Sequence, residues 1–111
     1  YMHIEIKYTQ FQPAENIEEY AMKSLGSLAH FLKGFEKNGE ITMFVEIARS
    51  TKHHRKGDVF YAEAMFQTGG TIMRAEATGP DIRLALDEVK EKLKKEIRRN
   101  KDKRIKARRE K

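Results

Sequence analysis

Cysteine is absent from this chain of 111 residues. Its absence excludes disulfide bonds, thiol catalysis and zinc sites built on cysteine. No apolar run approaches the roughly 20 residues that a membrane-spanning helix needs, and the N-terminus lacks the basic and then apolar layout of a secretory signal. We therefore expect a cytoplasmic protein with no membrane partner. The length is enough for one domain with a modest core.

The motifs of common enzyme classes are missing as well. The chain contains no P-loop, no GxGxxG, no HExxH and no GxSxG. His53 and His54 are the only histidine cluster, and adjacent histidines rarely converge on one metal without a further ligand nearby. Carboxylates such as Glu5, Glu46 and Glu63 are spread over predicted strands rather than paired as acid and base. We expect no enzyme activity, cofactor, metal or small-molecule substrate.

Positive charge, by contrast, is plentiful and confined to one end of the chain. The last 22 residues contain 13 basic and 4 acidic side chains, whereas residues 1–89 contain 10 basic and 13 acidic ones. A segregated basic block favours a polyanionic partner, most often nucleic acid. A charge run on a helix is usually only a solvated face, so the placement of the charges decides between the two interpretations.

Residue periodicity predicts a strand followed by a helix in the N-terminal third. MHIEIKYT alternates, with Ile4, Ile6 and Tyr8 on one side, which is typical of a half-buried strand. Pro13 suits the first turn of a helix. Apolar residues then recur at helical spacing as far as Leu32, and glycines at positions 34 and 39 close the segment.

Three further strands and a long helix are predicted in the rest of the chain. EITMFVEIAR, DVFYAEAMFQ and TIMRAEAT are strand-like, and Gly69-Gly70 joins the last two as a two-residue turn. Both faces of these last two strands carry apolar residues, so the sequence does not show which face is buried. Asp81 is a candidate N-cap for the second helix. The order β-α-β-β-β-α predicts an α+β fold, a four-stranded sheet with two helices packed on one face.

The second helix carries two distinct stripes at about 100° per residue. Its apolar stripe predicts the contact with the core, and a basic stripe lies roughly a quarter-turn away. Beyond Ile97 the apolar stripe would continue through the polar Asn100, so we expect packing to end near Arg99. The apolar stripe comprises Ile82, Ala85, Leu86, Val89, Leu93 and Ile97, and the basic stripe comprises Lys92, Lys95, Arg99, Lys103 and Lys106.

A second basic cluster, Lys52 to Lys56, lies in the loop between two predicted strands. Acidic residues of the helix lie mainly in its first half, and none lies within the line from Lys92 to Arg99. Loop and helix together could clamp a phosphate backbone. No exposed aromatic sheet motif is recognisable, so we expect RNA to be recognised by shape and phosphate rather than by base stacking.

The sequence also resembles the ribosome hibernation promoting factors and ribosome-associated inhibitors of bacteria, over about residues 2–103. The matching elements are H-x-K-G, Y-x-A-E, a glycine turn, A-x-A-x-x-x-D, A-[IL]-D and K-L-x-x-x-[IL]-x-[RK]. No element is specific alone, but their order and spacing are. They fall here at His54, Lys56 and Gly57; Tyr61 and Glu63; Gly70; Ala75, Ala77 and Asp81; Ala85, Leu86 and Asp87; and Lys92, Leu93, Ile97 and Arg99.

This resemblance implies the same fold, and binding to 16S rRNA of the small (30S) ribosomal subunit in the channel for mRNA and the A- and P-site tRNAs. It implies that the protein inhibits translation on 70S ribosomes and stores idle ribosomes in stationary phase or stress. By position, the rRNA contacts would be Lys92, Lys95 and Arg99, with Lys103 beyond them. His54 and Lys56 of the loop match a second motif of the family.

The chain departs from the family pattern at several positions. Gln12 stands where the family often has threonine, and Asn100 where it usually has an apolar residue. Often-basic positions of the first helix are Ser24, Ser27 and His30. The pattern ends near position 103, as in the short branch of the family. We predict a ribosome-binding domain over residues 2–100 and a basic C-terminal extension over 101–111.

Two other functions remain open from the residues. The chain could be a general RNA-binding or ribosome-assembly module of the same fold that acts away from mature ribosomes. It could instead be a protein-interaction module, in which the charged helix pairs with an acidic partner or with itself. Enrichment on intact 70S or 100S particles in resting cells separates the first alternative from hibernation, and nuclease-insensitive complexes would favour the second.

Overall fold

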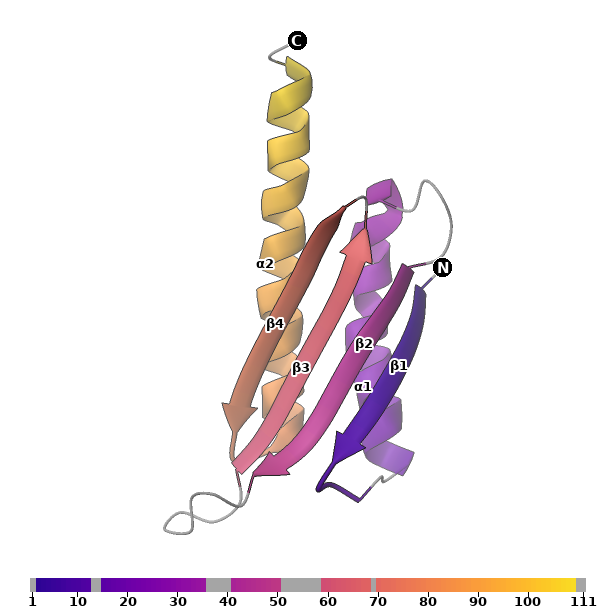
Figure 1. The fold of residues 1–111 in the computed structure, drawn as a ribbon, viewed down its shortest axis with the longest axis vertical. Coiled ribbons are helices and arrows are strands. Elements are labelled where there is room, and N and C mark those ends of the chain that lie inside the picture. The colour runs from indigo at the N-terminus through magenta and orange to yellow at the C-terminus, as the bar shows by residue number, and fades with distance from the viewer. Residues whose placement is uncertain (1, 13–14, 36–40, 51–58, 69, 110–111) are drawn as a thin grey trace.

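The computed structural model describes residues 2–12, 15–35, 41–50, 59–68 and 70–109, and their side chains except at 15, 33–35, 50 and 104–109. The strands form one mixed sheet in the order β1-β2-β3-β4 (Figure 1), in which β1 is parallel to β2 and the other neighbours are antiparallel. The elements in chain order are β1 (Met2–Thr9), α1 (Glu15–Gly26), the 3₁₀ helix η1 (Ser27–Phe35), β2 (Ile41–Ser50), β3 (Val59–Thr68), β4 (Thr71–Gly79) and α2 (Ile82–Arg109).

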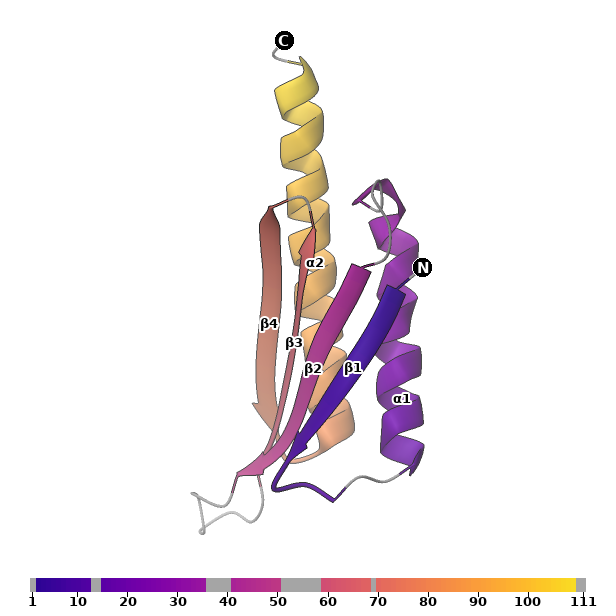
Figure 2. The ribbon, with the colours of Figure 1, turned by 45° about the vertical axis from the view of Figure 1, so that its right-hand side comes forward.

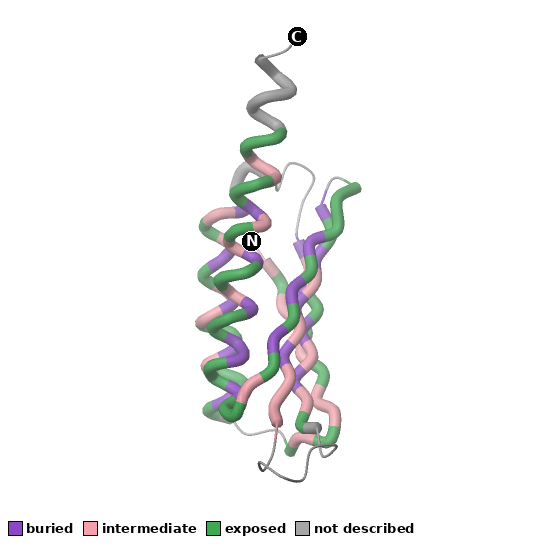
Figure 3. Tube along the Cα trace, turned by 90° about the vertical axis from the view of Figure 1, so that its left-hand side faces the viewer, coloured by how far each residue is buried: buried purple, intermediate pink, exposed green. Residues whose placement is uncertain are grey.

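Both helices cover the same face of the sheet, as the sequence predicted. In Figure 1, α1 lies behind β1 and β2, and α2 lies behind β3 and β4. In the turned view of Figure 2, α1 is seen beside β1 at the right. The buried residues lie between the two layers, whereas exposed residues line the outer side of each (Figure 3). The opposite face of the sheet is therefore open among the described residues. The predicted α+β fold is confirmed.

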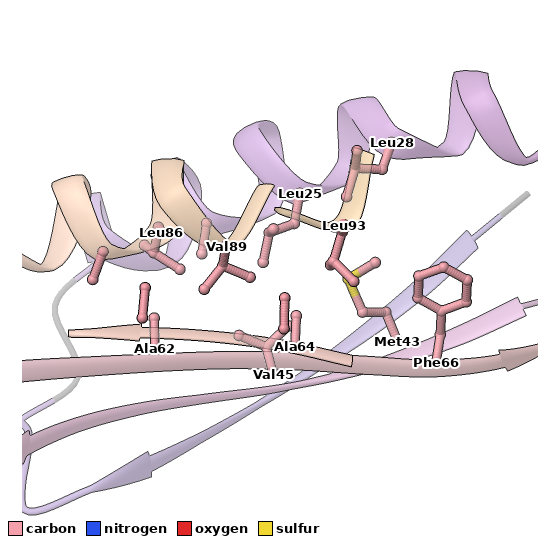
Figure 4. Close-up of a cluster of buried hydrophobic side chains, with 14 of the residues drawn as sticks. Leu25, Leu28, Met43, Val45, Ala62, Ala64, Phe66, Leu86, Val89 and Leu93 are labelled. Atoms are coloured by element: carbon pink, nitrogen blue, oxygen red, sulfur yellow. The ribbon is translucent and has the colours of Figure 1, made fainter. Parts of the chain in front are cut away.

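The core explains how closely α2 approaches the sheet. Ala62 and Ala64 of β3 point toward Leu86 and Val89 of α2 (Figure 4), and all four side chains are buried. Small side chains on the strand leave room for branched side chains on the helix, which gives the dense packing typical of interiors. Removing one large core side chain costs about 2–5 kcal/mol.

The structure settles which face of β3 and β4 is buried. Ala62, Ala64 and Phe66 of β3 face the helices, as do alternate residues of β4 from Met73 to Ala77. The apolar residues left on the open face include Met65, which is only half-buried, and Ile72, which is 60% exposed. Alternation alone could not choose between these faces because both carry apolar residues.

The predicted first helix is divided in the structure. Its α-helical part ends at Gly26 and continues as the 3₁₀ helix η1, within which Gly34 lies. The Ser27 hydroxyl donates a 2.7 Å hydrogen bond to the Ser24 carbonyl, a local bond that competes with the α-helical pattern. Leu28 and Leu32 of η1 remain fully buried, so the apolar spacing was correct although the helix type was not. Pro13 and residues 38–39, also part of that prediction, lie outside the described residues.

The turn between β3 and β4 agrees with the predicted hairpin. Thr68 pairs with Thr71, so two residues connect the strands. Gly70 has a φ of +82°. Residues other than glycine adopt this backbone conformation only at a cost in free energy. This turn brings the edge strand β4 back along α2 and so forms one wall of the candidate site.

Candidate nucleic-acid interface

An N-cap and a continuous apolar stripe fix the position of α2. The backbone N–H of Arg83 donates to the Asp81 carboxylate at 2.8 Å, and that of Ala85 donates to the Asp81 carbonyl at 3.1 Å. Asp81 therefore caps the helix as predicted. All six residues of the predicted apolar stripe are buried, from Ile82 at 5% exposure to Ile97 at 0%. Their burial sets the rotation of α2 and hence the direction in which its basic stripe points.

The basic residues of α2 line a groove against the edge of the sheet. The groove has a volume of about 420 Å³ between β4 and α2. Three of the predicted residues, Lys92, Lys95 and Arg99, are exposed along it. Its full lining is Arg74, Ala75 and Glu76 of β4 with Lys92, Lys95, Glu96 and Arg99 of α2. We refer to Lys92, Lys95, Arg99 and Lys103 as the basic line.

Lys92 has a structural contact in addition to its charge. Its ammonium donates a 2.9 Å hydrogen bond to the backbone carbonyl of Glu76 on β4, and it lies 3.6 Å from the Glu88 carboxylate. β4 is the edge of the sheet, where backbone carbonyls lack a strand partner. Lys92 satisfies one of these carbonyls. Because an ammonium has three N–H donors, it keeps donors for an external anion.

Acidic residues lie closer to the basic line than the sequence suggested. Arg99 lies 3.5 Å from Glu96, which lines the same groove, and Glu88 pairs with Lys92. No carboxylate belongs to the line itself, but spacings of three and four residues on α2 place Glu96 and Glu88 beside it. Such exposed pairs are weak, so a phosphate can replace them. Lys95 forms no hydrogen bond or ion pair with the described part of the chain.

Arg74 is a functional candidate that sequence reasoning missed. It lies on β4, lines the groove, and pairs with Glu63 and with Glu76, the latter at 3.1 Å. The Glu63 hydrogen bond, more than any other interaction, raises the pKa of Arg74 above its usual value. In the sequence, Arg74 alternates with Met73 and Ala75, which are buried in the structure. This alternation could predict an exposed Arg74 only once the buried face of β4 was known.

The acidic side of this cluster is held together by Tyr61. Its hydroxyl lies 2.6 Å from a Glu63 oxygen and 2.7 Å from a Glu76 oxygen. Burial and these two hydrogen bonds raise the pKa of Tyr61, while the Tyr61 and Arg74 hydrogen bonds lower the pKa of Glu63. The phenol is therefore neutral and Glu63 ionised near pH 7. Both carboxylates are thus hydrogen bonded to Tyr61 and paired with Arg74.

The remaining predicted site residues lie in different parts of the chain. Lys103 is exposed and follows Arg99 along α2, beyond the groove lining. His54 and Lys56 lie outside the described residues, so the predicted clamp between loop and helix stays a prediction.

Among the described side chains, no group of three or more could hold a metal ion. No helix in the described ranges is long and apolar enough to span a membrane.

Known proteins share this fold over nearly its whole length. The Protein Y N-terminal domain of Thermus thermophilus has a TM-score of 0.69 at 21% identity, covering 88% of this chain and 98% of that one. A ribosomal subunit interface protein from Coxiella burnetii has a TM-score of 0.71 at 17% identity, covering 91% and 99%. Comparison with curated protein sequences gives no match.

A family-level match goes beyond the fold. Residues 4–105 match the family described as sigma 54 modulation protein / S30EA ribosomal protein. The match covers the groove, the basic line and all of the sheet except the first two residues of β1. It is nearly the region that carried the resemblance to hibernation factors in the sequence. The chain therefore belongs to the family of sigma 54 modulation proteins and S30EA ribosomal proteins.

Proposed function

We propose that this protein is a ribosome hibernation factor that binds 16S rRNA of the small subunit through the groove between β4 and α2. Bound in the channel for mRNA and tRNA, it inhibits translation and stores idle cytoplasmic ribosomes during stress or stationary phase. The observation that carries the proposal is the basic line, whose direction is fixed by the buried apolar stripe of α2. Family membership supports the ribosome as partner, as does the similar fold of the ribosomal subunit interface protein from Coxiella burnetii.

The chemistry of the groove suits a phosphate backbone. Lys95 and Arg99 are exposed side by side along α2, and Arg74 reaches the same groove from β4. Lysine and arginine replace the counterions of RNA, and their release favours binding. Contacts of this kind fix position without reading sequence. That property suits a protein that must block a channel of fixed shape.

Charge reversal of the basic line tests the proposal. We expect Lys92→Glu, Lys95→Glu and Arg99→Glu together to abolish co-sedimentation with small subunits at physiological salt. Thermal unfolding must show that the triple variant still folds, because Lys92 also bonds to β4. If a folded triple variant still binds subunits, the groove is not the RNA surface.

A neutralising pair gives a finer measurement. Lys95→Gln with Arg99→Gln removes two charges from the groove, whereas Lys7→Gln with Lys23→Gln removes two exposed charges from β1 and α1. We expect only the first pair to lower the slope of log affinity against log salt, by about 0.7–0.9 per lost phosphate contact. Equal effects of the two pairs would mean that net charge alone drives binding.

Ribosome profiles separate hibernation from a general RNA-binding role. Added protein should inhibit translation and sediment with intact 70S or 100S particles from resting cells. An association confined to free RNA or assembly intermediates would favour the alternative function of an assembly module. A 100S peak on a sucrose gradient would show dimerisation of ribosomes as well as inhibition.

A further inference from the structure

The flank of α2 that faces α1 and η1 carries a second series of cations. Lys90, Lys94 and Arg98 follow one another at intervals of four residues, and Lys101 continues the series. Their side is set by contacts of α2 with the neighbouring helices. Lys94 lies with its ammonium 5.1 Å from the ring centre of Phe31 in η1, and Arg83 lies 5.7 Å from that of Tyr20 in α1. We refer to Lys90, Lys94, Arg98 and Lys101 as the second flank.

The second flank is less engaged internally than the basic line. None of its four members forms an ion pair with a described residue, whereas Lys92 and Arg99 do. Asp87, three residues before Lys90, accepts a 2.6 Å hydrogen bond from the Tyr20 hydroxyl. Like charges at i,i+4 spacing disfavour a helix. A polyanion would relieve this repulsion.

An acidic crest separates the second flank from the basic line. At about 100° per residue, the two series lie roughly 140° apart around α2. Between them the outer surface of the helix carries Glu91 and Asp102, both exposed. A phosphate backbone lying along this crest would meet carboxylates. A single strand therefore cannot follow the crest and satisfy both series.

We infer that α2 lies between two phosphate backbones, one on the basic line and a second RNA strand on the second flank. The rise of about 6 Å over four residues sets the spacing of the flank cations, which is comparable to that of successive phosphates along a strand. Phe31 holds Lys94 by a cation–π contact, and His30 packs edge-on against Phe31 with ring centres 5.6 Å apart. This preorganised flank is a second contact site for RNA and rests on the proposed function.

Neutralisation of the flank tests this inference. Lys90→Gln with Arg98→Gln spares the Lys94–Phe31 contact, and the pair Lys7→Gln with Lys23→Gln is the matched control. For purified small subunits we expect the flank pair to lower affinity roughly tenfold at physiological salt and to reduce the salt slope by about 1.4–1.8. The control pair should change both far less.

The outcomes distinguish this inference from the proposed function. If Lys95→Gln with Arg99→Gln weakens binding but the flank pair behaves as the control, the inference is wrong and the proposed function stands. If wild type itself fails to bind subunits, the proposed function fails first. Thermal unfolding of each variant establishes that it is folded before binding is compared.

The absence of cysteine makes the two-strand arrangement directly measurable. A single cysteine at Arg99→Cys or at Lys101→Cys, which lie about 160° apart around α2, provides a unique attachment point for a hydroxyl-radical probe. With subunits bound, the two probes should cleave two separate strand segments of the rRNA. Cleavage of the same segment from both positions would show that one strand contacts both sides and would overturn the inference.

Discussion

At the scale of single residues, Tyr61 organises the charges around the groove. Its hydroxyl has one proton to donate, so it hydrogen bonds to Glu63 or to Glu76 at any moment, and Arg74 completes the network by pairing with both. Glu63 thereby holds the guanidinium of Arg74 in place beside the groove. An arginine positioned by a carboxylate loses less freedom when it binds a phosphate.

Glu63→Gln tests this network through its dependence on pH. Hydrogen bonds from Tyr61 and Arg74 lower the pKa of Glu63 below its ordinary value of 4.5. The resulting stability is present above the unfolded pKa and is lost as pH falls through the lower folded pKa. We expect Glu63→Gln to be less stable than wild type at pH 7 by about 1 kcal/mol, and the two to converge in strong acid.

Urea denaturation across the acidic pH range measures this difference in free energy of unfolding. Tyr61→Phe removes one of the two donors to Glu63 and should flatten the pH dependence in part. A constant difference between Glu63→Gln and wild type at every pH would show that the carboxylate gains nothing from ionisation in the folded state.

At the scale of elements, the rotation of α2 determines the site. That rotation was predictable from sequence because the spacing from Ile82 to Ile97 follows the helical period, and the structure buries these residues. The bond from Lys92 to Glu76 and the entry of Arg74 into the groove were not predictable. Both depend on which face of β4 is buried and on how closely α2 approaches the sheet edge, and these are long-range properties.

The first helix shows a second limit of periodicity. Spacings of three and four residues occur in both α and 3₁₀ helices, so the apolar series from Ile17 to Leu32 could not reveal the change of helix type at Ser27. A local hydroxyl bond marks that change, and serine at such a position has several possible partners. The buried side was predictable and the backbone geometry was not.

Asp81→Ala tests how strongly the start of α2 is fixed. Loss of the carboxylate that accepts from the Arg83 N–H should cost about 1 kcal/mol, seen as a fall of about 4 °C in Tm. Asp81→Asn keeps an acceptor and should retain most of the stability. Asp102→Ala removes an exposed carboxylate within the helix and should stay within about 0.5 kcal/mol of wild type. An Asp81→Ala variant as stable as wild type would show that packing alone positions α2.

At the scale of the whole molecule, charge and shape are both asymmetric. The Cα radius of gyration of 15.5 Å exceeds the roughly 13 Å of a compact domain of this length, because α2 projects beyond the sheet (Figure 1). Ile97 is the last buried residue of α2 among the side chains described. Asn100 is half-buried and donates to the Glu96 carbonyl at 2.9 Å. These positions agree with packing that ends near Arg99.

Deletion of residues 104–111 tests whether the projecting end is an extension or part of the domain. The deletion removes five basic residues and one acidic residue and no buried contact described in the structure. We expect the free energy of unfolding to stay within about 0.5 kcal/mol of wild type. Subunit binding should weaken at low salt, because these cations add long-range attraction to RNA.

The salt dependence of this effect distinguishes attraction from directed contact. Charges that only raise the local potential are screened beyond a Debye length of about 10 Å at 0.1 M salt, so the difference from wild type should shrink as salt rises. The effect of Lys95→Gln with Arg99→Gln should persist, because those contacts are direct. If the deletion variant instead keeps its full deficit at physiological salt, the terminal segment makes contacts of its own, and the functional boundary lies beyond residue 100.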